Sequence, residues 1–456
     1  MLGKPRGPAC PGNGRMPRRV SVVGALLLFI ALLPSLAPES AWAGIGGRLQ
    51  TELAVRTGDR PALTKGLTFL QLHDTEWVGD NGRLTVVGRF FYDPVLDLGA
   101  ADRTNPRLQP GDEVEDRFFG AELKEAYLDL LGESLDLRLG RQIVRWGLLE
   151  GARITDRINP LDFREFLFRD VEDRYIPLWM ARVDYYPAWG DVQLLLIPDM
   201  TFHRPAPAGS EWEEFELPPD LARPKAAPEN TEVALRVGGA LGQGRLTASY
   251  FYTWDDFPAA FRSIFGVGGQ LTGATFDSRY ERLHVVGLTY SRSVSGSVLS
   301  LEGAYDHGKH LATDAGAVPG NEISRGVVRA GVGVDFNLSG VDYSILYFQE
   351  RILAWRAFIP ANRVEQAASL VVREAFFNDR IETQLLVLFF FTGRQRIVRP
   401  KIEYKVTDHV KVALGLDMLG GERGSEPDQP ALARDFRFVG YFKDHDRAWV
   451  TVSYLF

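Results

Sequence analysis

Apolar and polar residues alternate along much of the chain that follows residue 44. In the last segment of this kind, Val450, Val452 and Tyr454 share one face with Phe456. A period of two is typical of a β-strand with one apolar and one polar face. About eighteen such segments occur, each near the roughly 9 to 11 residues that a tilted strand needs to cross a bilayer. They cover residues 45–55, 66–77, 82–92, 119–130, 134–144, 178–187, 191–198, 231–240, 245–254, 282–292, 297–306, 326–337, 341–350, 366–377, 381–392, 396–406, 409–419 and 447–456.

The connections between these segments alternate in length. Every second connection is a short turn, such as Gly242-Gln-Gly244 or Ser339-Gly340. Most of the others are long and cover residues 93–118, 145–177, 199–230, 255–281, 307–325, 351–365 and 420–446. Short periplasmic turns and long outer loops are typical of outer-membrane barrels. Lipid cannot form hydrogen bonds with unpaired backbone N–H and C=O groups, so such a sheet must close on itself.

The pattern therefore predicts an all-β fold, a closed antiparallel transmembrane β-barrel of about 18 strands in the outer membrane. Both chain termini are expected on the periplasmic side. The stretch 434–443 also alternates, but we assign it to the last outer loop because counting it would make the number of strands odd.

One connection, residues 145–177, differs from the other predicted loops. Its charged residues are Arg145, Arg153, Arg157, Arg164, Arg169 and Arg174 among Asp156, Asp162, Glu165, Asp170, Glu172 and Asp173. So dense a mixture of charges needs water or close partners. A loop of this length is usually functional or disordered, and the apolar residues of the same stretch, including Trp146 and Phe166, argue against disorder. We expect this insertion to fold into the barrel lumen and constrict the pore.

The first 43 residues are expected to be a signal peptide. Arg15, Arg18 and Arg19 precede an apolar run, and Ala41-Trp-Ala43 provides small residues at a cleavage site. Met16 is an alternative start to Met1. Residues 44–456 then form one barrel domain, and the only cysteine, Cys10, is removed with the signal.

Charge excludes one class of partner. Residues 1–43 contain five basic residues and one acidic residue, so their removal takes the formal net charge from −7 to −11. An acidic chain of this kind argues against a nucleic-acid partner. After the signal, no apolar run approaches the roughly 20 residues of a transmembrane helix.

Two regions resemble a known family. They are Leu137-Arg-Leu-Gly-Arg-Gln-Ile-Val-Arg-Trp-Gly147 with the following Ile158-Asn-Pro-Leu-Asp162, and the closing stretch 442–456. They resemble a porin-like outer-membrane β-barrel family of Gram-negative bacteria that is largely described as a domain of unknown function. The Gly-Arg-Gln step is similar to alginate-export barrels. The resemblance implies an outer-membrane barrel with a transport role and does not indicate a substrate.

The candidate pore-constriction and solute-binding residues are arginines and acids in and around the insertion. They are Arg138, Arg141, Arg145, Arg153, Arg157, Asp162, Arg164, Glu165 and Arg182. Arginine offers a fixed fork of donors to a carboxylate or phosphate, so a ladder of arginines would guide a small anionic solute. The alternative, which the near-cancellation of local charge favours, is that these arginines pair with the acids and hold the insertion in place. Arg141 shares parity with Leu139, so either a bulge resets the strand there or Arg141 lies above the hydrocarbon.

Other functions find less support in the sequence. No cofactor is expected, and His307-Gly-Lys-His310 lacks a clear third metal ligand. No Gly-x-Ser-x-Gly or His-Glu-x-x-His motif occurs, which argues against an enzyme. A conduit for hydrophobic molecules, an export barrel and a structural or adhesive barrel stay open as alternatives to a porin-like channel.

The expected partners follow from the predicted location. They are outer-membrane lipid, lipopolysaccharide, the barrel-assembly machinery and an unidentified small solute. Tyr454 and Phe456 resemble the C-terminal signal read by that machinery. The sequence does not distinguish a monomer from a trimer.

Overall fold

The computed structural model describes residues 45–58, 61–97, 119–206, 210–213, 221, 223–267, 270–314, 316–422 and 438–456. Residues Gly46–Phe456 form one compact unit. The expected signal peptide, with Cys10, lies outside the described residues and stays a prediction. No helix within the described ranges is both long enough and apolar enough to span a bilayer.

Eighteen long strands build the barrel, as the alternation of apolar and polar residues predicted. They are β1 (Gly46–Arg56), β3 (Thr68–Val78), β4 (Gly82–Tyr92), β5 (Phe119–Leu130), β6 (Leu135–Gln142), β7 (Leu178–Tyr185), β8 (Gly190–Ile197), β9 (Glu232–Leu241), β10 (Gly244–Trp254), β13 (Arg282–Val294), β14 (Ser297–Ala312), β15 (Glu322–Leu338), β16 (Val341–Ile352), β17 (Val364–Phe376), β18 (Ile381–Phe390), β19 (Gln395–Lys405), β20 (Val410–Gly420) and β21 (Arg447–Leu455).

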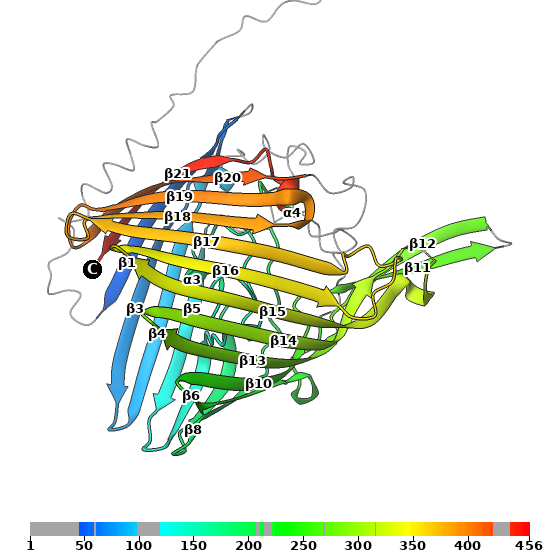
Figure 1. Ribbon diagram of the computed structural model, residues 1–456, viewed down its shortest axis with the longest axis horizontal. Coiled ribbons are helices and arrows are strands. Elements are labelled where there is room, and N and C mark those ends of the chain that lie inside the picture. The colour runs from blue at the N-terminus through cyan, green and yellow to red at the C-terminus, as the bar shows by residue number, and fades with distance from the viewer. Residues whose placement is uncertain are drawn as a thin grey trace, which may run out of the picture. The chain divides into compact units, whose positions relative to one another are not determined.

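Each barrel strand pairs antiparallel with the next along the chain (Figure 1). The first and last strands close the ring, with Arg48 opposite Leu455 and Arg56 opposite Arg447. The backbone of the terminal Phe456 continues this ladder, because its N–H donates to Gly47 O at 3.1 Å and its carbonyl accepts from Gly47 N at 2.8 Å. A closed sheet has no unpaired edge strand, so it is stable in lipid.

The two faces of the strands differ in polarity and exposure. On β13, Val286 and Leu288 are 48% and 53% exposed, whereas Leu283 and Val285 are buried. On β20, Leu414 is also exposed. An exposed apolar outer face over many strands suits a lipid surround and would be costly in water.

Short elements occupy several connections. They are β2 (Ala62–Lys65), β11 (Ala259–Val267), β12 (Gln270–Arg279), α2 (Pro94–Asp97), α3 (Val171–Arg174), α4 (Phe438–Tyr441) and the 3-10 turns η4 (Pro228–Asn230), η5 (Pro319–Asn321) and η6 (Thr392–Arg394). β2 pairs with β1, and β11 pairs with β12 as a separate hairpin. That hairpin extends beyond the rim of the barrel, on the side away from the C terminus (Figure 1).

Three loop boundaries expected from the sequence were wrong. The connections 56–65 and 255–281 contain the strand β2 and the β11–β12 hairpin, because loops above the membrane can also pair their backbones. Within 307–325, β14 and β15 continue their ladder to Ala312 and Glu322. The stretch 434–443 is not a strand where the structure describes it, because α4 occupies its last part.

Candidate functional site in the barrel lumen

The insertion of residues 145–177 leaves the barrel wall at the end of β6 and returns at the start of β7. Buried Asn159 ties its two ends together. The Asn159 Oδ1 atom accepts from Val144 N at 2.8 Å, and Nδ2 donates to Ile176 O at 2.8 Å. Asn159 of the Ile158-Asn-Pro160 motif therefore holds the beginning and the end of the insertion together by hydrogen bonds.

Glu302 of β14 anchors the first half of the insertion to the wall. Its Oε1 accepts from the backbone N–H groups of Leu148 and Leu149, and its Oε2 accepts from the Thr155 hydroxyl at 2.8 Å. A buried carboxylate with this many donors is well satisfied. Glu302 therefore faces the lumen from β14.

Wall glycines make room for the same half. A Cβ on Gly331 of β15 would lie 2.6 Å from Ile154 Cδ1, and one on Gly333 would lie 2.5 Å from Leu149 Cδ2. Ile154 and Leu149 belong to a buried apolar cluster that also contains Trp146, Ile158 and inward-facing residues of β7, β8, β9, β10, β13, β14 and β16. Apolar side chains of the insertion and of the barrel wall thus form one buried core.

The second half of the insertion packs on a distant part of the ring. Phe166 and Phe168 join a buried cluster with Trp212 and Phe442, beside β19 and β20. The Phe168 carbonyl accepts from Arg399 Nη2 at 3.1 Å. Since β14 and β20 are six strands apart along the ring, the insertion spans the lumen from one side to another.

A three-strand ion cluster supports this second contact. Asp417 of β20 is fully buried and accepts from Arg399 Nε of β19 and Arg447 Nε of β21, each at 2.6 Å. The Arg447 guanidinium also lies over the ring of Phe168, at 4.9 Å from the centroid. One carboxylate therefore fixes two arginines against the insertion.

Acids of the insertion are held ionised by neighbouring arginines and a lysine. Burial alone would raise the pKa of the Asp162 carboxyl, but Arg169 and Arg164 outweigh it and hold that pKa well below its usual value. The pKa of Glu165 is lowered in the same way, against burial, by Lys65 and Arg169. The Glu165 carboxylate lies 2.6 Å from Lys65 Nζ.

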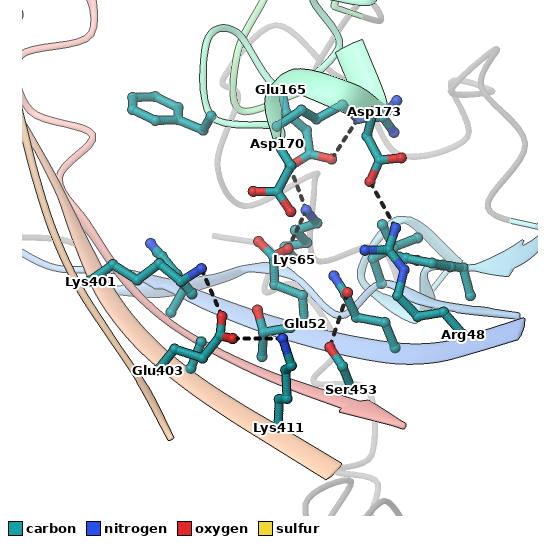
Figure 2. Close-up of a pocket in the computed structure, with 18 of the residues that line it drawn as sticks. Arg48, Glu52, Lys65, Glu165, Asp170, Asp173, Lys401, Glu403, Lys411 and Ser453 are labelled. Atoms are coloured by element: carbon teal, nitrogen blue, oxygen red, sulfur yellow. Dashed lines mark hydrogen bonds and ion pairs between the residues drawn. The ribbon is translucent and has the colours of Figure 1, made fainter. Parts of the chain in front are cut away.

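A cavity of about 180 Å³ lies between α3 and the wall formed by β1 and β19 to β21. Figure 2 shows Lys401, Glu403 and Lys411 on the wall, facing Asp170 and Asp173 of the insertion. Glu403 pairs with Lys401 at 2.9 Å and with Lys411 at 3.2 Å. The lining contains eight basic and five acidic side chains, so positive charge prevails. Its basic members are Arg48, Lys65, Arg89, Arg169, Arg399, Lys401, Lys411 and Arg447.

A second cavity, of about 210 Å³, lies on the side of β5 and shares Asp173 with the first. Asp173 pairs with Arg89 of β4 and with Arg48 of β1, the latter at 3.4 Å. Burial opposes ionisation of Asp173, but Arg89 and Arg48 lower the pKa of its carboxyl. This charged trio separates the two cavities.

The nine candidate residues do not form a single ladder. Glu165 lines the first cavity, and Arg141 and Asp162 line the second. The other six do not line either cavity. Five of them have carboxylate partners: Arg138 with Asp129, Arg145 with Asp156, Arg157 with Asp306, Arg164 with Asp162, and Arg182 with Asp184. Arg153 instead donates to the backbone carbonyls of Asp156 and Asn159. Their role in solute binding stays a prediction.

Sequence reasoning missed several residues of the first cavity. Lys65 lies in the connection 56–65, which was expected to be a loop, and Arg89 lies in residues 66–92, where the two strand faces could not be assigned. Arg48, in the expected strand 45–55, was not singled out. Arg447 had a signal, because it has the parity of Trp449, Thr451 and Ser453 on the inward face of the last strand.

Tyr454 and Phe456 occupy the end of the closing strand. Their rings stack at a centroid distance of 5.9 Å, and the Phe456 ring covers Gly47, where a Cβ would lie 2.3 Å from Cζ. The two residues thus pack at the seam of the barrel. Their role as an assembly signal stays a prediction.

A closed ring of eighteen antiparallel strands with an apolar outer face defines an outer-membrane β-barrel with the porin fold. Residues 59–194 match a family model described as "Protein of unknown function (DUF1302)". That region contains the 137–147 and 158–162 stretches on which the resemblance was based.

Solved structures agree with this fold. The chain is similar to OccAB2 of Acinetobacter baumannii at 10% identity and a TM-score of 0.51, over 91% of this chain and 97% of that chain. It is similar to OccAB3 of the same organism at 9% identity and a TM-score of 0.50, over 91% and 98% of the two chains. No curated protein matches the sequence significantly.

Proposed function

We propose that the protein is an outer-membrane channel for a small organic anion. The observation that carries the proposal is the first cavity, where basic side chains outnumber acidic ones between the insertion and the wall. Rings of basic side chains favour anions in narrow pores. The insertion narrows the lumen and places Asp170 and Asp173 in the lining of the same cavity as Lys401 and Lys411.

The cavity also argues for transport over a purely structural barrel. A barrel that serves only as a scaffold needs no cavity lined by charged side chains beside the insertion. Burying charged groups costs free energy, so such a cavity is more readily explained by a function. The histidine positions give no support to an enzyme. The His203 side chain is only 8% exposed, lies edge-on to the rings of Phe163 and Phe257, and its Nδ1 accepts from Leu161 N at 2.8 Å.

We expect a single channel in a planar bilayer to be anion-selective. Under a potassium chloride gradient, the zero-current potential should have the sign of chloride permeation, because the lining of the cavity has excess positive charge. Replacing Lys401 and Lys411 by Gln should move that potential towards zero. The matched control is Arg245→Gln, whose half-exposed side chain pairs with Asp191 away from this cavity. A cation-selective wild type would contradict the proposal.

A further inference from the structure

The barrel wall has an interrupted ladder between β5 and β6. The two strands pair from Leu130 opposite Leu137 up to Ala126 opposite Arg141, and the pairing ends there. β5 continues to Phe119, paired on its other side with β4. From that point β5 has no strand partner towards β6, because the chain after Gln142 turns into the lumen.

Two irregularities mark the same level of the wall. Lys124 of β5 has no partner in β4, where Val87 pairs with Glu125 and Gly88 pairs with Leu123, so β5 has a bulge there. Gly140 of β6 has a φ of 135°, and a Cβ on it would lie 2.2 Å from Ala126 O. Both strands are therefore bent where their ladder ends.

Side chains satisfy part of the open edge. Arg141 Nε donates to the Leu123 carbonyl at 2.8 Å, and the Glu125 carboxylate accepts from Ile143 N at 3.2 Å. Unpaired backbone groups are not tolerated in lipid. These two contacts satisfy the Leu123 carbonyl on the β5 side of the break and the Ile143 N–H on the β6 side. The ladders of β6 with β5 and β7 have no register shift, so a bulge in β6 does not explain the parity of Arg141.

The second cavity lies at this break and has both an apolar and a charged side. Leu123 and Trp179, on the outward face, are 44% and 48% exposed. Its charged lining consists of three basic and three acidic side chains, namely Lys124, Arg141 and Arg204 with Glu122, Asp162 and Asp173. The lining of the cavity therefore includes side chains from the outward face of the wall and from the lumen.

Two arginines of this cavity hold their acidic partners only loosely. Arg141 Nη1 is 4.0 Å from Asp199, and Arg204 Nη1 is 3.5 Å from Glu122 and 3.8 Å from Asp162. The Arg204 side chain is 43% exposed. These distances are longer than charge-assisted hydrogen bonds, so the guanidinium groups have donors to offer a carboxylate.

We propose that this break is a lateral portal at which an amphipathic monocarboxylate, such as a medium-chain fatty acid, enters from the membrane. Its carboxylate binds Arg141 and Arg204, and its alkyl chain lies against Leu123 and Trp179. Only the onward route, past Asp173 into the first cavity, rests on the proposed channel function.

Quenching of tryptophan fluorescence by brominated decanoate tests the portal in the detergent-solubilised full barrel. We expect saturable quenching that Trp179→Phe removes, and only non-saturable quenching by the uncharged brominated decanol. Arg141→Gln combined with Arg204→Gln should weaken decanoate binding about tenfold, the equivalent of one charge-assisted hydrogen bond. Arg204→Gln alone should weaken decanoate binding less. Because the Arg204 side chain is exposed, this single variant provides the test if the double variant does not fold.

The control is Arg245→Gln, which should bind decanoate as the wild type does. Unchanged binding in the Arg204→Gln variant, or saturable quenching by decanol with equal affinity, would overturn the portal. The zero-current potential of the wild-type barrel separates the two proposals. A wild type without chloride preference that still binds decanoate saturably would count against the channel alone, and a chloride-selective wild type without saturable decanoate binding would count against the portal alone.

Discussion

Replacing residues 150–172 by a short Gly/Ser turn is expected to raise single-channel conductance several-fold and to weaken ion preference. The replacement removes Ile154 and Phe168, by which the insertion packs on both sides of the lumen, and it removes Glu165 and Asp170 from the charged cavity. An eighteen-stranded barrel without a plug has room for an aqueous channel. Planar-bilayer recording of the variant measures both conductance and preference.

The control for this replacement is a change at the tip of the insertion. Glu150 is exposed, so Glu150→Ser should retain the conductance of the wild type. Heat-modifiable gel mobility reports whether each variant is a folded barrel. A folded barrel that lacks 150–172 and still conducts like the wild type would mean that the insertion does not limit the pore.

The second large effect is expected from Asp417→Asn. Asp417 is fully buried and is bonded to Arg399 and to Arg447, which is itself 2% exposed. Removing one partner of a buried ion pair leaves charge uncompensated and costs about 3 to 5 kcal/mol. We expect the free energy of unfolding to fall by about that amount, measured by denaturant titration of tryptophan fluorescence.

Asp191→Asn is the matched control for this change. Asp191 also pairs with one arginine, Arg245, but that arginine side chain is 51% exposed. Exposed pairs are worth roughly 0 to 1 kcal/mol. An equal decrease in the free energy of unfolding of the two variants would show that the buried cluster around Asp417 stabilises the barrel no more than an exposed ion pair does.

The barrel could be predicted from the sequence because each face of a membrane strand has a different solvent. Lipid outside and polar lumen inside impose a period of two, as in Leu414 and Leu416 on one face of β20 and Asp417 on the other. The lengths of the connections then fixed which ends of the strands lie together. All eighteen strands were found in this way.

The residues of the site could be predicted only in part, because the path of the insertion through the lumen determines which wall residues it contacts. The sequence indicated that residues 145–177 enter the lumen, and the contacts of Ile154 and Phe168 confirm this. It did not indicate that Asp173 would meet Arg48 and Arg89, because those contacts follow from strand tilt and from where α3 lies. The break between β5 and β6 was visible only as the odd parity of Arg141.

The most direct test of the central claim, that the insertion is docked inside the barrel lumen, is a disulfide between Thr155→Cys and Gly287→Cys. A Cβ on Gly287 would lie 3.5 Å from Thr155 Cβ, within the roughly 3.5 to 4.5 Å of natural disulfides. Cys10, in the expected signal peptide, is the only other cysteine. The control pair is Thr155→Cys with Leu288→Cys, because Leu288 neighbours Gly287 but faces outward. We expect mild oxidation to cross-link the Gly287 pair, seen as a reductant-sensitive shift of the unfolded chain on a gel, and to leave the Leu288 pair free. Absence of the cross-link at Gly287, or equal cross-linking of both pairs, would contradict the docked insertion.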